Sequence, residues 1–144
     1  GLLYRIYRGF YSIVPVGQID PILLGSRAIH KFCYLSVESV LSNEGYIFQK
    51  VYSDTFISEK SLSFEVAGNH FKSRQLAPKY LYNSEGIFKK NGYYVATLER
   101  AVADILYFNP KYHIDKPVNW KKIKIIQEKI GYPLTPQRYV DSKF

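Results

Sequence analysis

Residues 86–110 have the sequence GIFKKNGYYVATLERAVADILYFNP, in which a β-hairpin pattern runs directly into a helical one. The hairpin is indicated by Asn91-Gly92, because both residues readily adopt the positive φ that a tight two-residue turn requires. The expected cross-strand pairs are Lys90 with Tyr93, Lys89 with Tyr94, and Phe88 with Val95.

A helix is predicted after this hairpin, with Thr97 as its N-cap and Pro110 as its stop. Arg100 and Asp104 are four residues apart and are expected to pair on the outer face of the helix. The apolar residues recur with helical spacing and form one face: Leu98, Ala101, Val102, Ile105 and Leu106. Strands in hairpins next to helices, without alternating strand–helix–strand units, indicate the α+β class.

A second hairpin is predicted in residues 61–75, SLSFEVAGNHFKSRQ, with Gly68-Asn69 as its loop. Lys72 and Arg74 are then expected on the outer face, and the apolar side chains on the inner one. The expected pairs are Val66 with Phe71, Glu65 with Lys72, Phe64 with Ser73, and Ser63 with Arg74.

Further helices are expected on both sides of these hairpins. Asp20 and Pro21 are a good start signal for one helix, whose inner face would be Ile22, Gly25, Ile29 and Phe32. Ser36 is the expected N-cap of the next helix, which Gly45 ends. Near the C-terminus an amphipathic helix is predicted from Trp120 to Gly131, with Trp120, Ile123, Ile126 and Ile130 inward. A last short helix would begin at Thr135-Pro136.

Residues 2–13, LLYRIYRGFYSI, form a basic aromatic hairpin pattern with Arg8-Gly9 at the turn. Two interpretations are open: an edge hairpin that completes a sheet, or the wing of a winged helix-turn-helix, whose arginines Arg5 and Arg8 would touch DNA phosphates. In the second case the other helices of that domain precede Gly1. We expect a wing hairpin at 1–15 and an α+β domain at 20–144.

The composition favours a globular protein with an anionic partner. Of the 144 residues 47% are hydrophobic and 17% aromatic, and the net charge is +8. The chain has no apolar run long enough for a membrane span and no signal-peptide pattern, so a cytoplasmic location is expected. Cys33 is the single cysteine, and no cofactor or metal site is expected.

Two kinds of chemistry are open besides duplex binding. A metal-dependent nuclease would need clustered carboxylates, for which the candidates are Asp54 with Glu59 and Lys60, or Asp141 with Lys143; solvated surface charge is the other interpretation. The tyrosine-rich segments NGYYVA (91–96) and KYLYN (79–83) fit base stacking on a single strand, or alternatively sheet packing or a protein interface. The three histidines have no ligand spacing.

Four segments together resemble the AbiEi family, the transcriptional regulators and antitoxins of bacterial type IV toxin–antitoxin, abortive-infection operons. They are YRIYRGFYSIVP (4–15), DPILLGSRAI (20–29), CYLSVESVLSNEGYI (33–47) and YYVATLERAVADILYFNP (93–110). The likeness covers about Leu2 to Pro110 and consists mainly of apolar and capping residues. No signature of the family is found in the C-terminal part.

The resemblance implies a non-enzymatic regulator that represses its own operon and neutralises a nucleotidyltransferase-like toxin. It matches Arg5 and Arg8 to the wing hairpin, whereas the helix-turn-helix proper is missing from this chain. On this hypothesis double-stranded operator DNA is contacted by Arg5 and Arg8, and the basic surface is extended by Lys72, Arg74, Lys89 and Lys90. The alternatives are a metal-dependent nuclease and a protein-interaction module without DNA binding.

Overall fold

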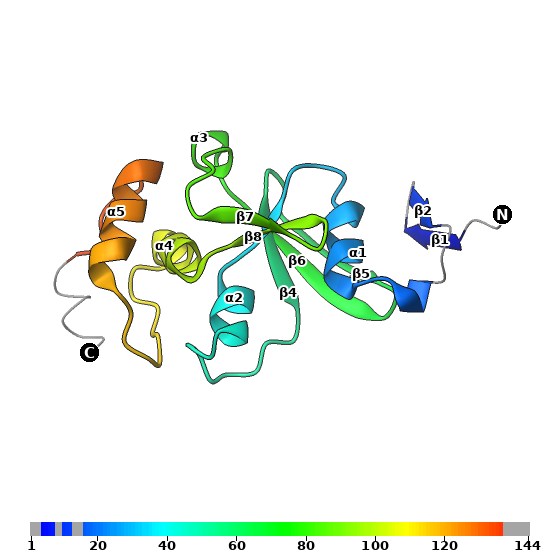
Figure 1. Cartoon of the computed structure of the whole chain (residues 1–144), viewed down its shortest axis with the longest axis horizontal. Coiled ribbons are helices and arrows are strands. Elements are labelled where there is room, and N and C mark those ends of the chain that lie inside the picture. The colour runs from blue at the N-terminus through cyan, green and yellow to red at the C-terminus, as the bar shows by residue number, and fades with distance from the viewer. Residues whose placement is uncertain (1–3, 8–9, 13–15, 137–144) are drawn as a thin grey trace.

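The computed structural model describes residues 4–7, 10–12 and 16–136, which contain a six-stranded mixed sheet and a separate two-stranded hairpin (Figure 1). The hairpin consists of β1 (Tyr4–Tyr7) and β2 (Phe10–Ser12). The sheet contains β3 (Tyr34–Leu35), β4 (Asp54–Ser58), β5 (Leu62–Val66), β6 (Asn69–Gln75), β7 (Ile87–Lys90) and β8 (Tyr93–Ala96). Helical segments are η1 (Val16–Gln18), α1 (Pro21–Ala28), α2 (Glu38–Asn43), α3 (Pro78–Leu81), α4 (Leu98–Phe108) and α5 (Trp120–Ile130). The α+β class is confirmed.

The sheet has the order β5-β6-β4-β3-β8-β7, so a hairpin forms each edge and two single strands form the centre. The central strands β3 and β4 are antiparallel, and each lies parallel to the inner strand of one hairpin. The centre is the most buried part of the sheet, since Tyr34, Phe56 and Ile57 are completely buried. The core therefore depends on pairings between strands that are distant in the sequence.

The β7–β8 hairpin has the predicted register: Lys90 pairs with Tyr93, Lys89 with Tyr94, and Phe88 with Val95. Asn91 and Gly92 form its turn with φ values of 51° and 88°. Positive φ at both central residues is the geometry that matches the twist of the flanking strands.

The predicted register of the β5–β6 hairpin is wrong. Its turn is Ala67-Gly68, with φ values of 51° and 81°, rather than Gly68-Asn69. The observed pairs are Val66 with Asn69, Glu65 with His70, Phe64 with Phe71, and Ser63 with Lys72. Each residue of β5 is thus paired two positions earlier in β6 than expected, which leaves every side chain on its predicted face. Val66 and Phe71 are buried and Lys72 is exposed, as predicted.

Helix α1 begins as predicted but is shorter. The Ile22 amide donates to Asp20 Oδ1 (2.9 Å), and Pro21 is the first helical residue. The helix ends at Ala28, and His30 takes a left-handed φ of 58°, so Phe32 lies beyond the helix and not on its inner face. A Cβ on Gly25 would lie 2.6 Å from the Phe71 ring, so this glycine allows close approach of α1 to the sheet.

The predicted N-cap of helix α2 is wrong. Its N-cap is Val37, not Ser36, because the Ser36 hydroxyl is buried and donates to Asp104 Oδ2 (2.7 Å). The predicted C-terminal signal is confirmed. Gly45 has a φ of 78°, its amide donates to the Ser42 carbonyl, and the next amide donates to the Leu41 carbonyl, which is a Schellman ending.

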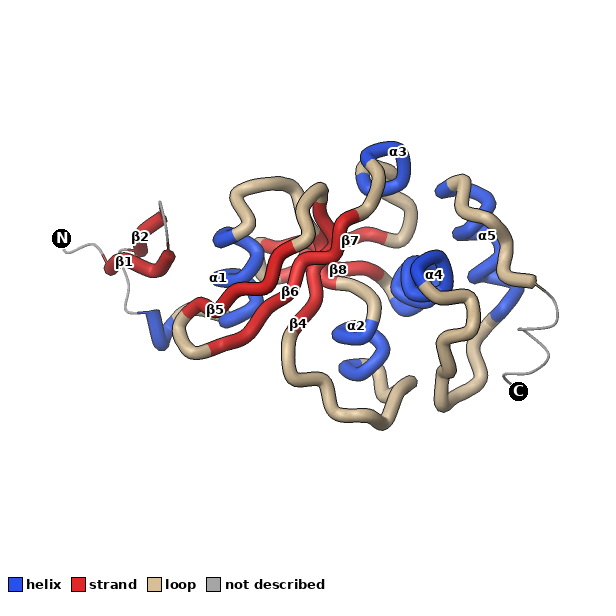
Figure 2. Tube along the Cα trace, turned by 180° about the vertical axis from the view of Figure 1, so that it is seen from behind, coloured by secondary structure: helices blue, strands red, loops and turns tan. Residues whose placement is uncertain are grey.

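Arg100 and Asp104 of α4 lie in the core, so the prediction that they pair on the outer face is wrong. Both side chains are 0% exposed, and Arg100 Nε donates to Asp104 Oδ1 at 3.1 Å. Figures 1 and 2 both show α4 between the sheet and α5. A helix that is covered on two sides buries polar as well as apolar positions, and these must then be paired inside the protein.

The remaining predictions concern the two ends of the chain. Helix α5 ends at Gly131 as predicted, with Ile123 and Ile130 buried and Trp120 and Ile126 half-buried. The N-terminal hairpin is confirmed as a β1–β2 pair, whereas its Arg8-Gly9 turn and the expected helix after Thr135-Pro136 lie outside the described residues. Among the described residues, no helix combines the length and apolar character that a membrane span needs.

Candidate nucleic-acid interface

The six cations predicted to contact DNA are distributed over three places in the chain. Arg5 lies in β1, where its backbone pairs with Tyr11, and Arg8 lies outside the described residues. Lys72 and Arg74 are two residues apart on β6 and share one face of the sheet. Lys89 and Lys90 are exposed neighbours on β7, so their side chains point to opposite faces.

The strand register shows how far apart these groups are. Arg74 lies beside Ile57, Ile57 opposite Tyr34, Tyr34 beside Tyr94, and Tyr94 opposite Lys89. Arg74 and Lys89 therefore occupy one row on one face, but four strand spacings of about 4.8 Å separate them by roughly 19 Å. Helix α4 covers the middle of this row, since the Tyr34 hydroxyl donates to Asp104 (2.9 Å). The structure thus brings Lys72 and Arg74 together and keeps Lys89 apart from them.

Lys72 and Arg74 share a concave surface with a third cation, Lys50, that the sequence did not single out. We call this surface the β6 groove and define it by Lys50, Tyr52, Lys72 and Arg74. It has a volume of about 300 Å³. The other residues that line it are Glu38, Gln49, Val51, Ser53, Thr55 and Tyr112. Three cations against the single carboxylate of Glu38 give the groove a net positive charge.

The 46–53 loop brings Lys50 to the groove and is held by the segment after α4. The Phe48 amide donates to Asp115 Oδ2 (2.7 Å), and the Asp115 amide donates to the Tyr46 carbonyl (2.9 Å). Gln49 Nε2 donates to the Tyr112 hydroxyl (2.9 Å). These bonds fix the residues that precede Lys50, whose ammonium lies 5.1 Å from the ring centroid of the exposed Tyr52.

The cations of the groove differ in how far the protein already uses their charge. Arg74 pairs with Glu38 (3.5 Å), and its guanidinium lies 4.9 Å from the Phe108 ring centroid. Lys50 and Lys72 are exposed and form no ion pair with any residue in the described part of the chain. Two ammonium groups are therefore available for an anionic partner, beside an arginine held in a fixed orientation.

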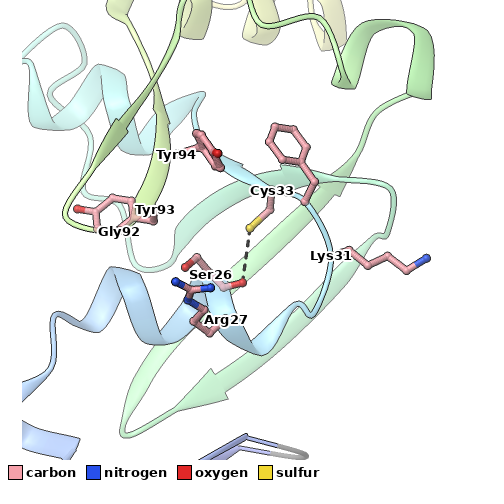
Figure 3. A pocket seen from close by; sticks show the side chains of 8 residues that line it. Ser26, Arg27, Lys31, Cys33, Gly92, Tyr93 and Tyr94 are labelled. Atoms are coloured by element: carbon pink, nitrogen blue, oxygen red, sulfur yellow. Dashed lines mark hydrogen bonds between the residues drawn. The ribbon is translucent and has the colours of Figure 1, made fainter. Parts of the chain in front are cut away.

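A second basic pocket lies where β3 and β8 begin, next to the C-terminal turn of α1 (Figure 3). Arg27 and Lys31 contribute the charge, and Tyr94 is exposed at the rim. The pocket has a volume of about 190 Å³, and no carboxylate lines it; its other residues are Ser26, Phe32, Cys33, Gly92 and Tyr93. No local pattern in the sequence could have identified Arg27, Lys31 or Lys50, because loop placement and strand pairing bring them to these surfaces.

Among the described residues, the candidate carboxylates Asp54 and Glu59 are not brought together. Asp54 begins β4, whereas Glu59 follows the other end of that strand, where it accepts from the Tyr82 hydroxyl (2.6 Å) and pairs with Lys31 (3.5 Å). Asp141 and Lys143 lie outside the described residues. Within the described ranges, no three His, Cys, Asp or Glu side chains are grouped so that they could hold a metal ion.

Cys33 is buried, and its thiol donates to the Ser26 carbonyl (3.6 Å). Burial raises the pKa of this thiol to about 12. A protonated thiol is a poor nucleophile, so the geometry assigns Cys33 to packing beneath the pocket.

Comparisons of this chain with protein-family models, with curated proteins and with solved structures found no match.

Proposed function

We propose that the chain is a transcriptional regulator and antitoxin without enzymatic activity, which binds the operator of its own operon and neutralises a nucleotidyltransferase-like toxin. The observation that carries the DNA part is the β6 groove, where Lys72 and Arg74 meet Lys50 beside an exposed tyrosine. The toxin part is supported by the resemblance to AbiEi regulators.

The groove suits a phosphate backbone for two physical reasons. Its unpaired ammonium groups can replace counterions along a duplex, which gives affinity with little sequence preference. Its arginine is held by Glu38 and Phe108, so less side-chain entropy is lost when a phosphate binds. Base readout would come from elsewhere, because the groove offers no helix long enough to enter a major groove.

The two alternatives differ in what they require. A nuclease using Asp54 and Glu59 lacks the paired carboxylates that hold a catalytic Mg²⁺, since these residues lie at opposite ends of β4. An interaction module requires only the toxin interface, and co-purification with the product of the neighbouring gene would detect it. Duplex binding separates the regulator from the interaction module.

The test is a fluorescence-anisotropy titration of the protein with duplex DNA from its own promoter and with a scrambled duplex. Lys50→Gln/Lys72→Gln removes the two unpaired charges of the groove. Lys121→Gln/Lys124→Gln on α5 is the matched control, because both lysines are exposed and the change in net charge is the same.

We expect both duplexes to bind at low salt, with the groove variant at least ~10-fold weaker than the α5 control. An equal loss in both double variants would show that only net charge matters and would reject the groove. Failure of the unmodified protein to bind either duplex at low salt would reject the DNA part of the proposal and leave the toxin part, which co-purification tests.

A further inference from the structure

The tyrosine-rich segments NGYYVA and KYLYN each place one exposed tyrosine on the same surface. Tyr94 is 41% exposed and Tyr82 is 55% exposed. Phe32 lies between them, with its ring centroid 5.5 Å from that of Tyr94 and 5.6 Å from that of Tyr82. We call these three residues the aromatic ridge. Of the neighbouring tyrosines, Tyr93 is buried and Tyr80 is half-buried against the core, so each segment has one exposed ring.

The ridge has a rigid support. The Phe32 ring also contacts Tyr34 (6.2 Å between centroids), and the Tyr34 hydroxyl is bonded to Asp104 in the core. Tyr82 is oriented by its hydroxyl, which donates to Glu59. The rings are therefore held in place before any ligand arrives, which lowers the entropy cost of binding.

Cations flank the ridge on the side of Tyr94. Arg27 lies on the α1 side of the adjoining pocket, while Lys31 extends outward (Figure 3) and pairs with Glu59 near Tyr82. Lys89 is the register partner of Tyr94 and shares its face of the sheet. Among the described residues Arg27 and Lys89 form no ion pair, so both charges are available to a ligand.

The Glu59 carboxylate sits at the other end of the ridge. Glu59 accepts from Tyr82 and pairs with Lys31, and the Tyr82 hydroxyl holds the pKa of Glu59 below its usual range. The cations without an ion pair, Arg27 and Lys89, therefore lie on the Tyr94 side of the ridge, whereas the carboxylate lies on the Tyr82 side. This polarity gives an anionic ligand a preferred side of the ridge.

We propose that the aromatic ridge and its adjoining pocket bind an unpaired strand of nucleic acid. Bases stack on Tyr94 and Tyr82, and the backbone follows Arg27 and Lys89. Exposed aromatic faces next to cations are the features with which proteins hold single strands. A duplex cannot use such a ridge, because its base faces are already stacked on one another. At about 190 Å³ the pocket is smaller than typical small-molecule sites, so it suits a single base or phosphate group of a longer strand.

The test measures the anisotropy of labelled dT12 and rU12 at low salt, with an unlabelled duplex as competitor. Tyr82→Leu/Tyr94→Leu removes both stacking faces but keeps apolar cover over Phe32. Phe88→Leu is the matched control, because Phe88 is 44% exposed on the neighbouring strand and faces the other side of the sheet. Circular dichroism verifies that each variant is folded.

We expect the ridge variant to bind dT12 at least ~10-fold more weakly than the unmodified protein, and Phe88→Leu to stay within ~2-fold. Arg27→Gln should reduce the salt slope for dT12 by about 0.7. The groove variant Lys50→Gln/Lys72→Gln should keep its affinity for dT12, which separates this proposal from duplex binding. A preference for dT12 or rU12 would indicate the source of the strand.

Three results would overturn the proposal. The first is absence of dT12 and rU12 binding by the unmodified protein at low salt. The second is an equal effect of Phe88→Leu and the ridge variant. The third is displacement of dT12 by duplex as effective as by unlabelled dT12, which would place the strand in the β6 groove.

Discussion

Arg100 and Lys72 carry the same charge, and the fold uses them in opposite ways. Arg100 is completely buried and directs all five of its N–H groups at protein acceptors: Asp104, the Tyr34 hydroxyl and the carbonyls of Tyr80, Asn83 and Glu85. Lys72 is exposed and pairs with no described acidic residue. One charge is used within the protein, and the other is available to a partner.

Asp104 is also buried, and its carboxylate is hydrogen-bonded within the protein as completely as the Arg100 guanidinium. Its two oxygens accept from Arg100 and from the hydroxyls of Tyr34, Ser36 and Tyr132. A buried pair of this kind is destabilised strongly when one member is removed. Surface lysines, by contrast, contribute little to stability. Changes in the core network should therefore affect folding, and changes in the β6 groove should affect binding.

The largest effect is expected from Arg100→Leu. It leaves the Asp104 carboxylate buried without its cation and orphans three carbonyls, so the free energy of unfolding should fall by about 3–5 kcal/mol. Urea unfolding followed by circular dichroism measures this, with Lys121→Gln as a surface control expected within about 0.5 kcal/mol. Equal unfolding midpoints for the two variants would contradict the distinction between the buried network of Arg100 and the exposed lysines.

A smaller loss of stability is expected from Gly25→Ala, which changes no charge. The new Cβ would lie 2.6 Å from the Phe71 ring and push α1 away from the sheet, at a cost of about 1–3 kcal/mol. Gly17→Ala is the matched control, since in the described part of the chain nothing lies within 4 Å of its Cβ position. Under conditions where both variants are folded, their affinity for duplex DNA should be the same. A selective loss of affinity in Gly25→Ala would contradict the separation between core residues that affect folding and groove residues that affect binding.

Arg74→Gln tests a residue that pairs within the protein and also lines the β6 groove. Its ion pair with Glu38 is partly exposed, so unfolding should change by no more than about 1 kcal/mol. Its charge also faces the groove, so duplex affinity should fall several-fold at low salt. Thermal melts and anisotropy on the same preparation check both values. A loss of stability with unchanged duplex affinity would show that Arg74 does not contribute to DNA binding.

The smallest effect concerns Cys33. Because burial raises the pKa of its thiol from 9.0 to about 12, the thiol stays protonated in the native state at pH 8. Iodoacetamide should therefore modify it only when denaturant is added, which mass spectrometry detects. Above pH 9 the unfolded chain loses this proton first, so the contribution of Cys33 to stability should decline as the pH rises from about 9 to 12. Rapid modification without denaturant would contradict this, because it would show that Cys33 becomes accessible in the native protein.

The sequence predicted features whose cause is local. Asn91-Gly92 determined the β7–β8 register, and Asp20, Thr97 and Gly131 marked helix ends, because a turn or cap depends on few neighbouring residues. The β5–β6 register was missed because Ala67 takes a positive φ that alanine seldom adopts. The faces were still correct, since a shift of two residues preserves the alternation.

Features that depend on distant segments could not be predicted in this way. Arg100 and Asp104 have the spacing of a surface pair, and only the covering of α4 by both the sheet and α5 buries them. Lys50 joins Lys72 through a loop held by Asp115, a contact between residues far apart in the chain. The predicted DNA contacts were thus grouped by sequence proximity, whereas the fold joins Lys72 and Arg74 with Lys50 and keeps Lys89 apart from them.

The most direct test of the distinction between used and available charge is the salt dependence of duplex binding. The slope of log K against log salt concentration should become shallower by about 1.8 in Lys50→Gln/Lys72→Gln, because each lost phosphate contact contributes about 0.9. The slope should remain unchanged in Lys121→Gln/Lys124→Gln. Identical slopes for the two double variants would contradict the assignment of the β6 groove as the DNA-binding surface.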